Sequence, residues 1–323
     1  MPYMRYYRSQ LNDTEKKAYD ALVDAISRRE DQVKLPRIDN DQLGRVYTAV
    51  DYDYPDFFYV DFYYYNGYVR ILDTVVNVKY TMSTSEAKKY KREIDNIAKK
   101  IVAGATGMSD LEKVTYLNDE IRKLAVYDRN PNNEFNAQHL IGTFLDGKCV
   151  CEGFAKSFKY LADMLELKCI LVVGDSGVRG KNERHAWNMV QIDGESYYID
   201  VTYNDVYRDK KTGKILHFSR AYFNLSDREI RRDHLPDTMF ALPACPKSMS
   251  QIPIVSCTND LISGIRHGYA KKEKFTEIRV TKKFEIDEIV KLIENNMSTS
   301  DRQWYYQIKM YYLSDYTFAI EWK

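Results

Sequence analysis

Apolar side chains recur at helical spacing in several stretches of this sequence, and most of these stretches begin at residues that can cap a helix. The starts are Asn12 with Glu15, Ser83-x-x-Glu86, Ser109-x-x-Glu112 and Ser226-x-x-Glu229. They predict helices over residues 9–28, 83–102 and 109–125, and a shorter one from 226 to near 234. Another amphipathic helix is predicted from residue 152, with an apolar face formed by Phe154, Ala155, Phe158, Leu161, Ala162 and Leu165.

Other stretches have the β-branched and aromatic content of strands, and two dipeptides between them favour tight hairpin turns. Asp193-Gly194 separates residues 184–192 from 195–203, and Asn66-Gly67 separates residues 57–65 from 68–80. Both dipeptides predict two-residue type I′ turns. The remaining predictions are a loop over 34–42, a short helix over 137–145, a strand over 169–174, and a tail with a strand over 275–281, a helix over 285–295 and strands over 305–313 and 317–322.

Cys151 is predicted to lie at the start of the helix that follows it. Free backbone amides and the positive end of the helix dipole converge at that position. Both favour the thiolate over the thiol, and the thiolate is the nucleophilic form. An isolated cysteine at such a place is more often a buried apolar residue, so Cys151 needs partners before it indicates chemistry.

The predicted hairpin supplies those partners. If Asp193-Gly194 is the turn, Trp187 lies opposite Asp200, and His185 and Asp200 project from the same face as diagonal neighbours. A three-residue turn would put them on opposite faces. A carboxylate fixes the tautomer of an imidazole, and an oriented imidazole beside a thiol can take its proton. Alone, His185 could be a half-buried strand histidine and Asp200 a strand-end residue, but the three residues together indicate a thiol active site.

The segments GKCVCEGFAKSF, RHAWNMV and YYIDVTYND resemble the three motifs of the transglutaminase-like superfamily, whose fold is papain-like. The resemblance covers residues 109–236 best, and YFNLSDREIRRDH is similar to bacterial members. It implies Cys151 as nucleophile, His185 as general base and acid, and Asp200 as the residue that orients the histidine. Cys149, two residues before Cys151, is a local departure that we interpret as structural, although a thiol so close could form a mixed disulfide on oxidation.

The resemblance implies a thiol-dependent hydrolase or acyltransferase that cleaves a peptide or amide bond through a thioester. Hydrolysis is favoured, because bacterial relatives are mostly regarded as peptidase-like or of unknown substrate. Two alternatives stay open: a transglutaminase that crosslinks proteins or incorporates amines, and a non-catalytic binding or assembly module on the same fold. Gln138 is a candidate for binding the oxyanion together with the Cys151 amide, or else a solvated polar residue of its helix. Trp187 could line the substrate channel or belong to the core.

The predicted architecture is α+β, with a papain/transglutaminase-like core in which the helix bearing the cysteine packs on an antiparallel sheet bearing the histidine and aspartate. We expect an N-terminal helix and hairpin region over residues 1–105, the catalytic core over 106–240, a Pro-rich linker over 241–255 and a small α+β domain over 256–323. Many of the 28 tyrosines cluster in VDYDYPDFFYVDFYYYNGYVR. An aromatic stripe can bind sugar or peptide, but the face of an antiparallel sheet is the more common reason for one.

Composition narrows the class of partner. The 323 residues carry a net charge of +1 without a basic block, so nucleic-acid binding by charge is not indicated. No run is long enough to span a membrane, and the start lacks an apolar signal core, so we expect a cytoplasmic protein unless a precursor carried an export signal. Five cysteines without a C-x-x-C pair or zinc-ligand spacing predict no disulfide framework, metal or other cofactor. The expected partner is a protein or peptide substrate; its identity and the oligomeric state stay open.

Overall fold

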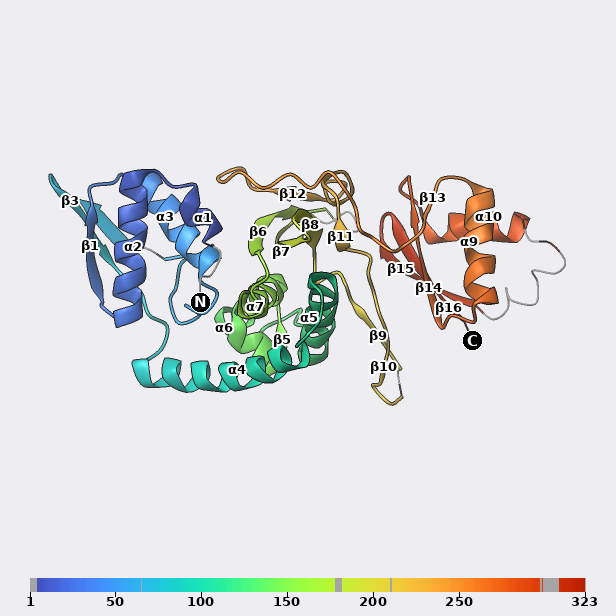
Figure 1. Ribbon diagram of the computed structural model, residues 1–323, viewed down its shortest axis with the longest axis horizontal. Coiled ribbons are helices and arrows are strands. Elements are labelled where there is room, and N and C mark those ends of the chain that lie inside the picture. Colours follow the sequence, from blue (N-terminus) through green and yellow to red (C-terminus); the bar gives the residue numbers. More distant parts are fainter. Residues whose placement is uncertain are drawn as a thin grey trace.

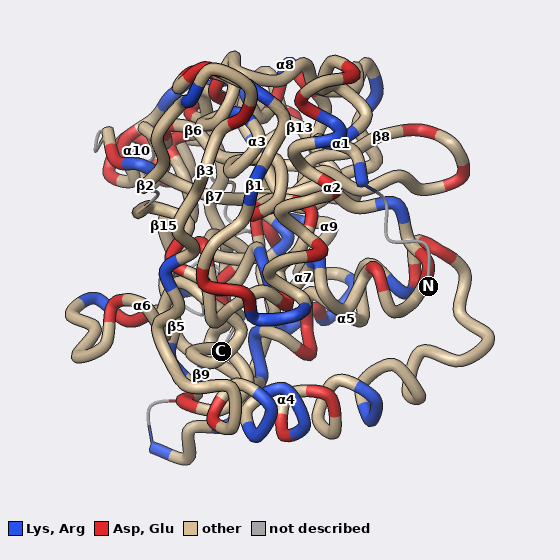
Figure 2. The backbone as a smooth tube through the Cα atoms, turned by 90° about the vertical axis from the view of Figure 1, so that its left-hand side faces the viewer, with Lys and Arg blue, Asp and Glu red and all other residues tan. Residues whose placement is uncertain are grey.

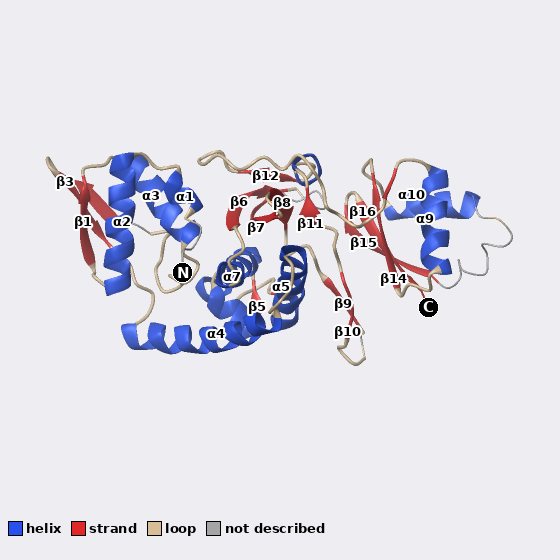
Figure 3. Ribbon diagram, viewed as in Figure 1, coloured by secondary structure: helices blue, strands red, loops and turns tan. Residues whose placement is uncertain are grey.

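The computed structural model describes residues 5–64, 66–177, 182–209, 211–296, 298 and 308–322. Three groups of elements follow one another along its longest axis (Figures 1 and 3). Helices with a small sheet form the N-terminal group, a five-stranded sheet with helices forms the centre, and a four-stranded sheet with helices forms the C-terminal group. Helices and mainly antiparallel sheets make up these groups, and the predicted α+β class is confirmed. The predicted domain boundaries stay a prediction.

The N-terminal group packs helices against a three-stranded antiparallel sheet of order β1-β3-β2. Asn12 caps its longest helix through the predicted capping box, in which Glu15 accepts a hydrogen bond from the Asn12 amide at 2.9 Å. The elements are α1 (Tyr6–Ser9), α2 (Asp13–Arg28), α3 (Asn40–Asp53), β1 (Gln32–Pro36), β2 (Asn66–Val69) and β3 (Asp73–Asn77).

The hairpin predicted around Asn66-Gly67 is wrong. Strand β2 begins at Asn66, and the chain reverses instead between Arg70 and Asp73, where the Arg70 guanidinium holds the Asp73 carboxylate at 2.6 and 2.8 Å. Residues 57–64 form turns and a single β-bridge at Val60 rather than a strand, and the side chains of Phe57 and Phe58 are buried in the core. The sheet interpretation of the tyrosine-rich stretch therefore fails for most of its length.

Strand β1 also differs from the loop predicted for residues 34–42. Pro36 lies at the end of this edge strand, where the missing N–H costs no ladder hydrogen bond.

The central group is built on a sheet of strand order β11-β8-β7-β6-β12 whose neighbouring strands are all antiparallel. The capping boxes at Ser83, Ser109 and Ser226 are present, as predicted. The elements are α4 (Thr84–Gly104), α5 (Asp110–Leu124), β4 (Val126–Tyr127), α6 (Glu134–Ala137), the π-helical turn η1 (Gly142–Asp146), β5 (Lys148–Cys149), α7 (Cys151–Met164), β6 (Cys169–Ser176), β7 (Glu183–Ile192), β8 (Glu195–Ile199), β9 (Val206–Arg208), β10 (Ile215–Phe218), β11 (Phe223–Leu225), α8 (Asp227–Ile230) and β12 (His234–Pro236).

Four of these elements, α6, η1, α8 and β12, correct the predicted bounds. The helix predicted over 137–145 is divided between α6 and η1. The helix predicted from 226 to near 234 ends at Ile230, and residues 234–236 form β12 instead.

Both faces of the central sheet are covered, and alternate residues of β6 show how. Ile170 and Val172 pack in one apolar cluster with α1, α2 and α3, whereas Cys169 packs in another cluster with Phe158 of α7. Leu171 packs beside Ala155 of the same helix. Because side chains alternate along a strand, the N-terminal group covers one face and α7 the other. The sheet is therefore held between the N-terminal group and α7, both of which border the candidate site.

The chain leaves β12 through residues 237–245, which we call the strap. The strap crosses the N-terminal group: the Ala241 amide donates to Gln10 at 2.8 Å, and Gln10 donates back to the Ala241 carbonyl at 3.0 Å. Phe240 and Cys245 of the strap are buried in the same cluster as α1 and α3. The strap thus joins the N-terminal group to the central sheet.

The C-terminal group contains a sheet of order β13-β14-β16-β15. A buried ion pair between Arg279 and Glu229, 2.9 Å long, ties it to the central group. Helix α9 has no predicted counterpart, and residues 305–307 of the predicted strand 305–313 lie outside the described residues. The elements are β13 (Ile254–Val255), α9 (Thr258–Ala270), β14 (Phe275–Val280), α10 (Ile286–Asn296), β15 (Ile308–Ser314) and β16 (Thr317–Trp322).

Acidic and basic residues are interspersed over the face shown in Figure 2, in keeping with the net charge of +1. Among the described residues, no helix is both long enough and apolar enough to cross a lipid bilayer.

Candidate active site

The hairpin that carries the predicted histidine and aspartate has the predicted turn. Asp193 and Gly194 have φ angles of 50° and 86°, as a type I′ turn requires. Strands β7 and β8 then pair from Ile192 with Glu195 to Asn188 with Ile199. His185 lies beyond this ladder and pairs with Gly174 of β6. The two-residue turn therefore confirms the predicted register. In this register the side chains of His185 and Asp200 lie on the same face of the sheet.

His185 and Asp200 are in direct contact. Nε2 of His185 donates to Oδ2 of Asp200 at 2.7 Å, and both side chains are buried. The other carboxylate oxygen accepts from the backbone amides of Thr202 at 2.8 Å and Tyr203 at 3.2 Å. Oδ2 also accepts a hydrogen bond from His234, so four donors in total converge on this carboxylate. Asp200 is therefore rigidly oriented toward the imidazole.

The charges of this pair stabilise each other. Burial alone would lower the pKa of His185, but the charge and hydrogen bond of Asp200, followed by contributions from Cys151, raise that pKa to about 10. Burial likewise would raise the pKa of Asp200, but the two imidazoles lower it well below its usual value. At neutral pH the arrangement therefore favours an imidazolium beside a carboxylate.

Cys151 is the first residue of α7, after the N-cap Val150, and its side chain is half-buried. A hydrogen bond and an electrostatic contribution from this thiol help to raise the pKa of His185. Because Nε2 is bound to Asp200, Nδ1 is the ring nitrogen left for the thiol. Two residues on, a Cβ at Gly153 would lie 2.4 Å from the Ala137 carbonyl oxygen, so only glycine allows α7 to approach α6 this closely.

Cys149 differs from Cys151 in its surroundings. Its side chain is buried, and burial raises the pKa of its thiol to about 12. This environment agrees with the structural role that we predict for it.

The thiol and the imidazole face one cavity of about 300 Å³. Gln138, the C-cap residue of α6, also lines this cavity; its role toward an oxyanion stays a prediction. Trp187 is 0% exposed and is not among the lining residues. Its ring stacks on His185 with centroids 5.9 Å apart, a core position that gives no support to the predicted channel role. The lining residues are Thr48, Asp51, Tyr52, Phe62, Tyr63, Gln138, Val150, Cys151, Glu152, Val173, Arg184, His185 and Ala186.

His234 is a member of the site that the sequence does not single out. Its Nε2 donates to Oδ2 of Asp200 at 3.1 Å, and its Nδ1 donates to Oδ1 of Asp233 at 2.7 Å. Carboxylate oxygens only accept, so both ring nitrogens carry protons and His234 is a cation. Burial would lower its pKa, but these two carboxylates raise it. Only the pairing of β12 with β6 brings this residue to the site.

The same three side chains are the described residues that could hold a metal ion. One ligand atom each from His185, Asp200 and His234 lies within 4.8 Å of the others. Imidazole nitrogens and a carboxylate oxygen are ligands that zinc accepts. Here the hydrogen bonds of 2.7 and 3.1 Å occupy these atoms, so an ion would have to displace the protons that the two imidazoles share with Asp200.

A buried ionic cluster lies on the side of the cavity next to α3. Lys156 of α7 bridges Asp51 and Glu152, with its Nζ 2.8 Å from an oxygen of each. The hydroxyl of Tyr63 donates to the other oxygen of Glu152 at 2.7 Å. No motif marks this cluster in the sequence, because Asp51 and Tyr63 reach α7 only through the packing of the N-terminal group.

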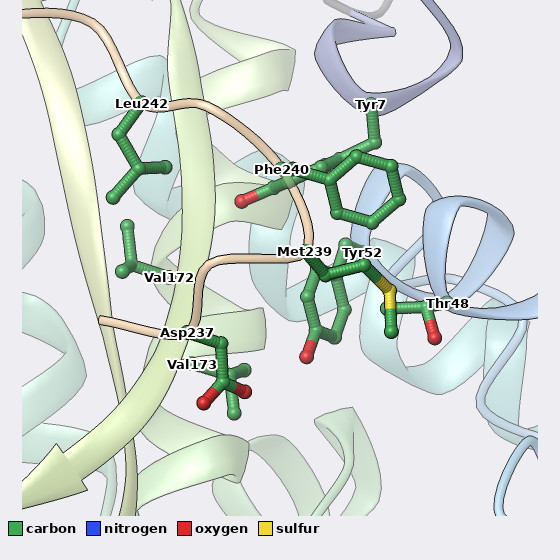
Figure 4. Close-up of a pocket in the computed structure, with 9 residues that line it drawn as sticks. All are labelled: Tyr7, Thr48, Tyr52, Val172, Val173, Asp237, Met239, Phe240 and Leu242. Atoms are coloured by element: carbon green, nitrogen blue, oxygen red, sulfur yellow. The ribbon is translucent and has the colours of Figure 1, made fainter. Parts of the chain in front are cut away.

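A second cavity of about 220 Å³ adjoins the first and shares Thr48, Tyr52 and Val173 with it. Figure 4 shows the strap passing over this cavity, with Met239 close to Tyr52 of α3. Arg184 of β7 fastens the strap beside His185, because its guanidinium holds both oxygens of Asp237 at 2.9 and 2.6 Å. The strap and α3 therefore bound the region next to the thiol.

Comparison with known proteins identifies the central part of the chain. Residues 95–201 match the model of the Transglutaminase-like superfamily. The resemblance carried by the three motifs is thereby confirmed, and this superfamily includes thiol enzymes. A search of curated proteins finds no match.

Solved structures that resemble the chain include a TGase and the periplasmic domain of TgpA from Pseudomonas aeruginosa. The first is 17% identical with a TM-score of 0.33, over 46% of this chain and 47% of that one. The second is 12% identical with a TM-score of 0.27, over 42% of this chain and 55% of that one. The chain thus spans about half the length of these transglutaminase-like structures.

Proposed function

We propose that this protein is a thiol-dependent hydrolase or acyltransferase that acts on a peptide or amide bond. The observation that carries the proposal is a half-buried thiol at the start of α7 that lines the same cavity as His185, which is in turn bound to Asp200 at 2.7 Å. A nucleophile, a base and a group that orients the base are the parts that covalent acyl transfer requires. The family match supports the same class of chemistry.

In the proposed reaction, the sulfur of Cys151 attacks the carbonyl carbon and forms a C–S bond. The backbone amide of Cys151, free at the start of its helix, and the Gln138 side chain would bind the oxyanion. His185 then donates its proton to the nitrogen of the leaving amine, the C–N bond breaks, and a thioester remains. Asp200 keeps the imidazole in place throughout.

Water completes the reaction when His185 takes one of its protons and the hydroxide oxygen attacks the thioester. The acid is released and the thiol is regenerated. An amine in place of water would form a new amide, which is the transamidation alternative. We favour hydrolysis for this chain, as the resemblance to bacterial relatives implies.

The proposal is tested by alkylating the protein with iodoacetamide at graded pH and locating the modified cysteine by mass spectrometry. We expect Cys151 to react rapidly below pH 7 and His185→Ala to slow it. Cys257, the exposed cysteine, is an internal reference for the alkylation rate in the same molecule. Cys151→Ala should retain the fold and abolish amide cleavage. If Cys151 reacts no faster than Cys257 below pH 7 and is indifferent to His185→Ala, the proposal is refuted.

A further inference from the structure

The cavity beside Cys151 has an acidic and aromatic side that the proposed reaction does not use. Asp51 and Glu152 contribute carboxylates, and each residue is only 8% exposed. Tyr52, Phe62 and Tyr63 line the same cavity, and the Tyr63 hydroxyl donates to Glu152. Glu152 directly follows the proposed nucleophile, so a ligand on this side would lie next to the reacting thiol.

The buried cluster contains one cation fewer than it has carboxylates. Lys156 lies between Asp51 and Glu152 and balances one of them. His139 is 3.4 Å from Lys156 but adds no charge. Its Nδ1 donates to the Phe135 carbonyl, and its Nε2 accepts from Lys156, because an ammonium group can only donate. Burial, followed by the charge of Lys156, lowers the pKa of His139 to about 3. The cluster therefore has a net negative charge.

The other cations that line the cavity are His185, which is paired with Asp200 at 2.7 Å, and Arg184. Its guanidinium is already paired with Asp237 at 2.6 Å and with Asp175 at 3.2 Å. This group of three also has one carboxylate more than it has cations. Arg184 therefore does not compensate the cluster.

One carboxylate oxygen of Asp51 remains available to a ligand. Oδ1 of Asp51 binds Lys156 at 2.8 Å, whereas Oδ2 forms no hydrogen bond within the described part of the chain. Burial raises the pKa of Asp51, and Glu152 adds to the rise while Lys156 opposes it. A second cation at Oδ2 would stabilise this carboxylate.

We propose that this side of the cavity binds a primary ammonium group of the substrate, with Oδ2 of Asp51 as its anchor and Tyr52 and Tyr63 as aromatic walls. An ammonium group donates three hydrogen bonds and is attracted to the faces of aromatic rings. The inference rests on the proposed function, because it places the ammonium next to a carbonyl under attack by Cys151. The group is either the free amino terminus of a short peptide or the amine of a lysine side chain.

The test uses three small thiol reagents that differ in charge: the 2-aminoethyl, trimethylammonioethyl and sulfonatoethyl methanethiosulfonates. Each reacts in the same way, because the thiolate attacks the sulfenyl sulfur, a mixed disulfide forms and methanesulfinate leaves. Labelling rates at Cys151 and at the exposed Cys257 are measured in the same molecule by mass spectrometry. Dividing the rate at Cys151 by that at Cys257 removes the intrinsic reactivity of each reagent.

We expect the aminoethyl reagent to exceed the sulfonatoethyl reagent at Cys151 by roughly tenfold after this correction, which corresponds to one charge pair of moderate strength. Asp51→Asn should abolish most of the preference while leaving Glu152 to pair with Lys156. Thr48→Lys, which adds a cation to the lining without altering a buried ion pair, should reverse the preference. Asp24→Asn removes the same charge from the exposed face of α2 and is the matched control.

The outcomes separate this inference from the proposed function. Rapid labelling of Cys151 by all three reagents without charge preference, or a preference that survives Asp51→Asn, overturns the ammonium site and leaves the thiol enzyme standing. Failure of every reagent to label Cys151 in folded protein overturns both. Equal corrected rates for the aminoethyl and trimethylammonioethyl reagents reject a hydrogen-bonded site, because the trimethylammonium group has no N–H to donate to Asp51.

Protection experiments identify the source of the ammonium. Cys151 is alkylated with iodoacetamide in the presence of alaninamide, N-acetyl-lysinamide or N-acetylalaninamide. Greater protection by alaninamide indicates an amino terminus, and greater protection by N-acetyl-lysinamide indicates a lysine side chain. If neither compound protects better than N-acetylalaninamide, which has no ammonium, the proposed site is rejected.

Discussion

Replacing Asp200 by Asn should convert His185 from a cation to a neutral imidazole at pH 7. The change is best made in a Cys151→Ala background, so that the thiol does not contribute. The rise of the His185 pKa from 6.5 to about 10 corresponds to about 5 kcal/mol, at about 1.36 kcal/mol per pH unit. Asp200 is the largest cause that raises this pKa, and burial opposes it. Without the carboxylate, burial should prevail and the pKa should fall below 6.5.

The assay is an NMR titration of the histidine ring resonances. The chain has five histidines, so each signal can be assigned by single substitution. We expect the His185 signal to titrate well above pH 6.5 in Cys151→Ala, although lower than with the thiol present, and below pH 6.5 in the double variant. His234→Gln is the matched control, because it removes the other imidazole and leaves Asp200 charged for His185; here the pKa should stay high. A His185 pKa that stays well above 6.5 after Asp200→Asn would refute the reasoning.

The same pair also makes stability depend on pH in a defined direction. The folded pKa of His185 lies above its unfolded value, so its contribution is complete below pH 6.5 and is lost as pH rises through about 10. The folded pKa of Asp200 lies below 3.8, so its contribution is present above that pH and is lost in stronger acid. Asp200→Asn should therefore cost about 3–5 kcal/mol of unfolding free energy between about pH 4 and 6.5, and less toward pH 10. Denaturant titrations at graded pH measure this difference.

Two further predictions concern packing and buried charge. Gly174→Ala would place a Cβ 2.1 Å from the Leu235 carbonyl oxygen. We therefore expect the free energy of unfolding, measured with denaturant, to fall by about 1–3 kcal/mol. Gly264→Ala, whose Cβ would have its nearest neighbour at 3.8 Å, is the control and should be neutral or stabilising. Lys156→Met leaves two buried carboxylates without their cation and should cost about 3–5 kcal/mol at pH 7. The second loss should shrink as pH falls and the carboxylates take up protons, and a loss independent of pH would contradict it.

Local signals predict the parts of this fold that depend on neighbouring residues alone. The Asp193-Gly194 turn forms as predicted because the flanking strands are in register and their buried face is continuous. Asn66-Gly67 has the same turn chemistry but lies within β2, and the residues before it form turns with Phe57 and Phe58 in the core, so no strand precedes it to pair with. Tertiary packing therefore overrides turn preference where a strand partner is missing.

The residues of the candidate site are also of two kinds: those that local sequence signals predict, and those that only tertiary packing brings to the site. Cys151, His185 and Asp200 can be predicted because each lies in a recognisable local setting and one hairpin register joins two of them. His234 and Asp51 cannot, because they reach the site through β12 and α3, far away in the chain. Asp51 lies in no recognisable motif, and His234, although it ends the segment YFNLSDREIRRDH that is similar to bacterial members, has no local feature that marks it as a partner of Asp200.

The residues that line the cavity also differ in whether the family match includes them. The family match ends at residue 201 and begins at 95, so it contains the thiol, the imidazole and the carboxylate that orients it. The cavity is completed by residues outside that range: Thr48, Asp51, Tyr52, Phe62 and Tyr63 line it, and the strap is fastened to β7 beside it. Groups that perform a bond-breaking step can be common to a superfamily, whereas the groups that select a substrate need not be. If the ammonium site is correct, the choice of substrate by this protein depends on its N-terminal group, and exchanging that group should change which amides are cleaved without changing the reactivity of Cys151 toward iodoacetamide.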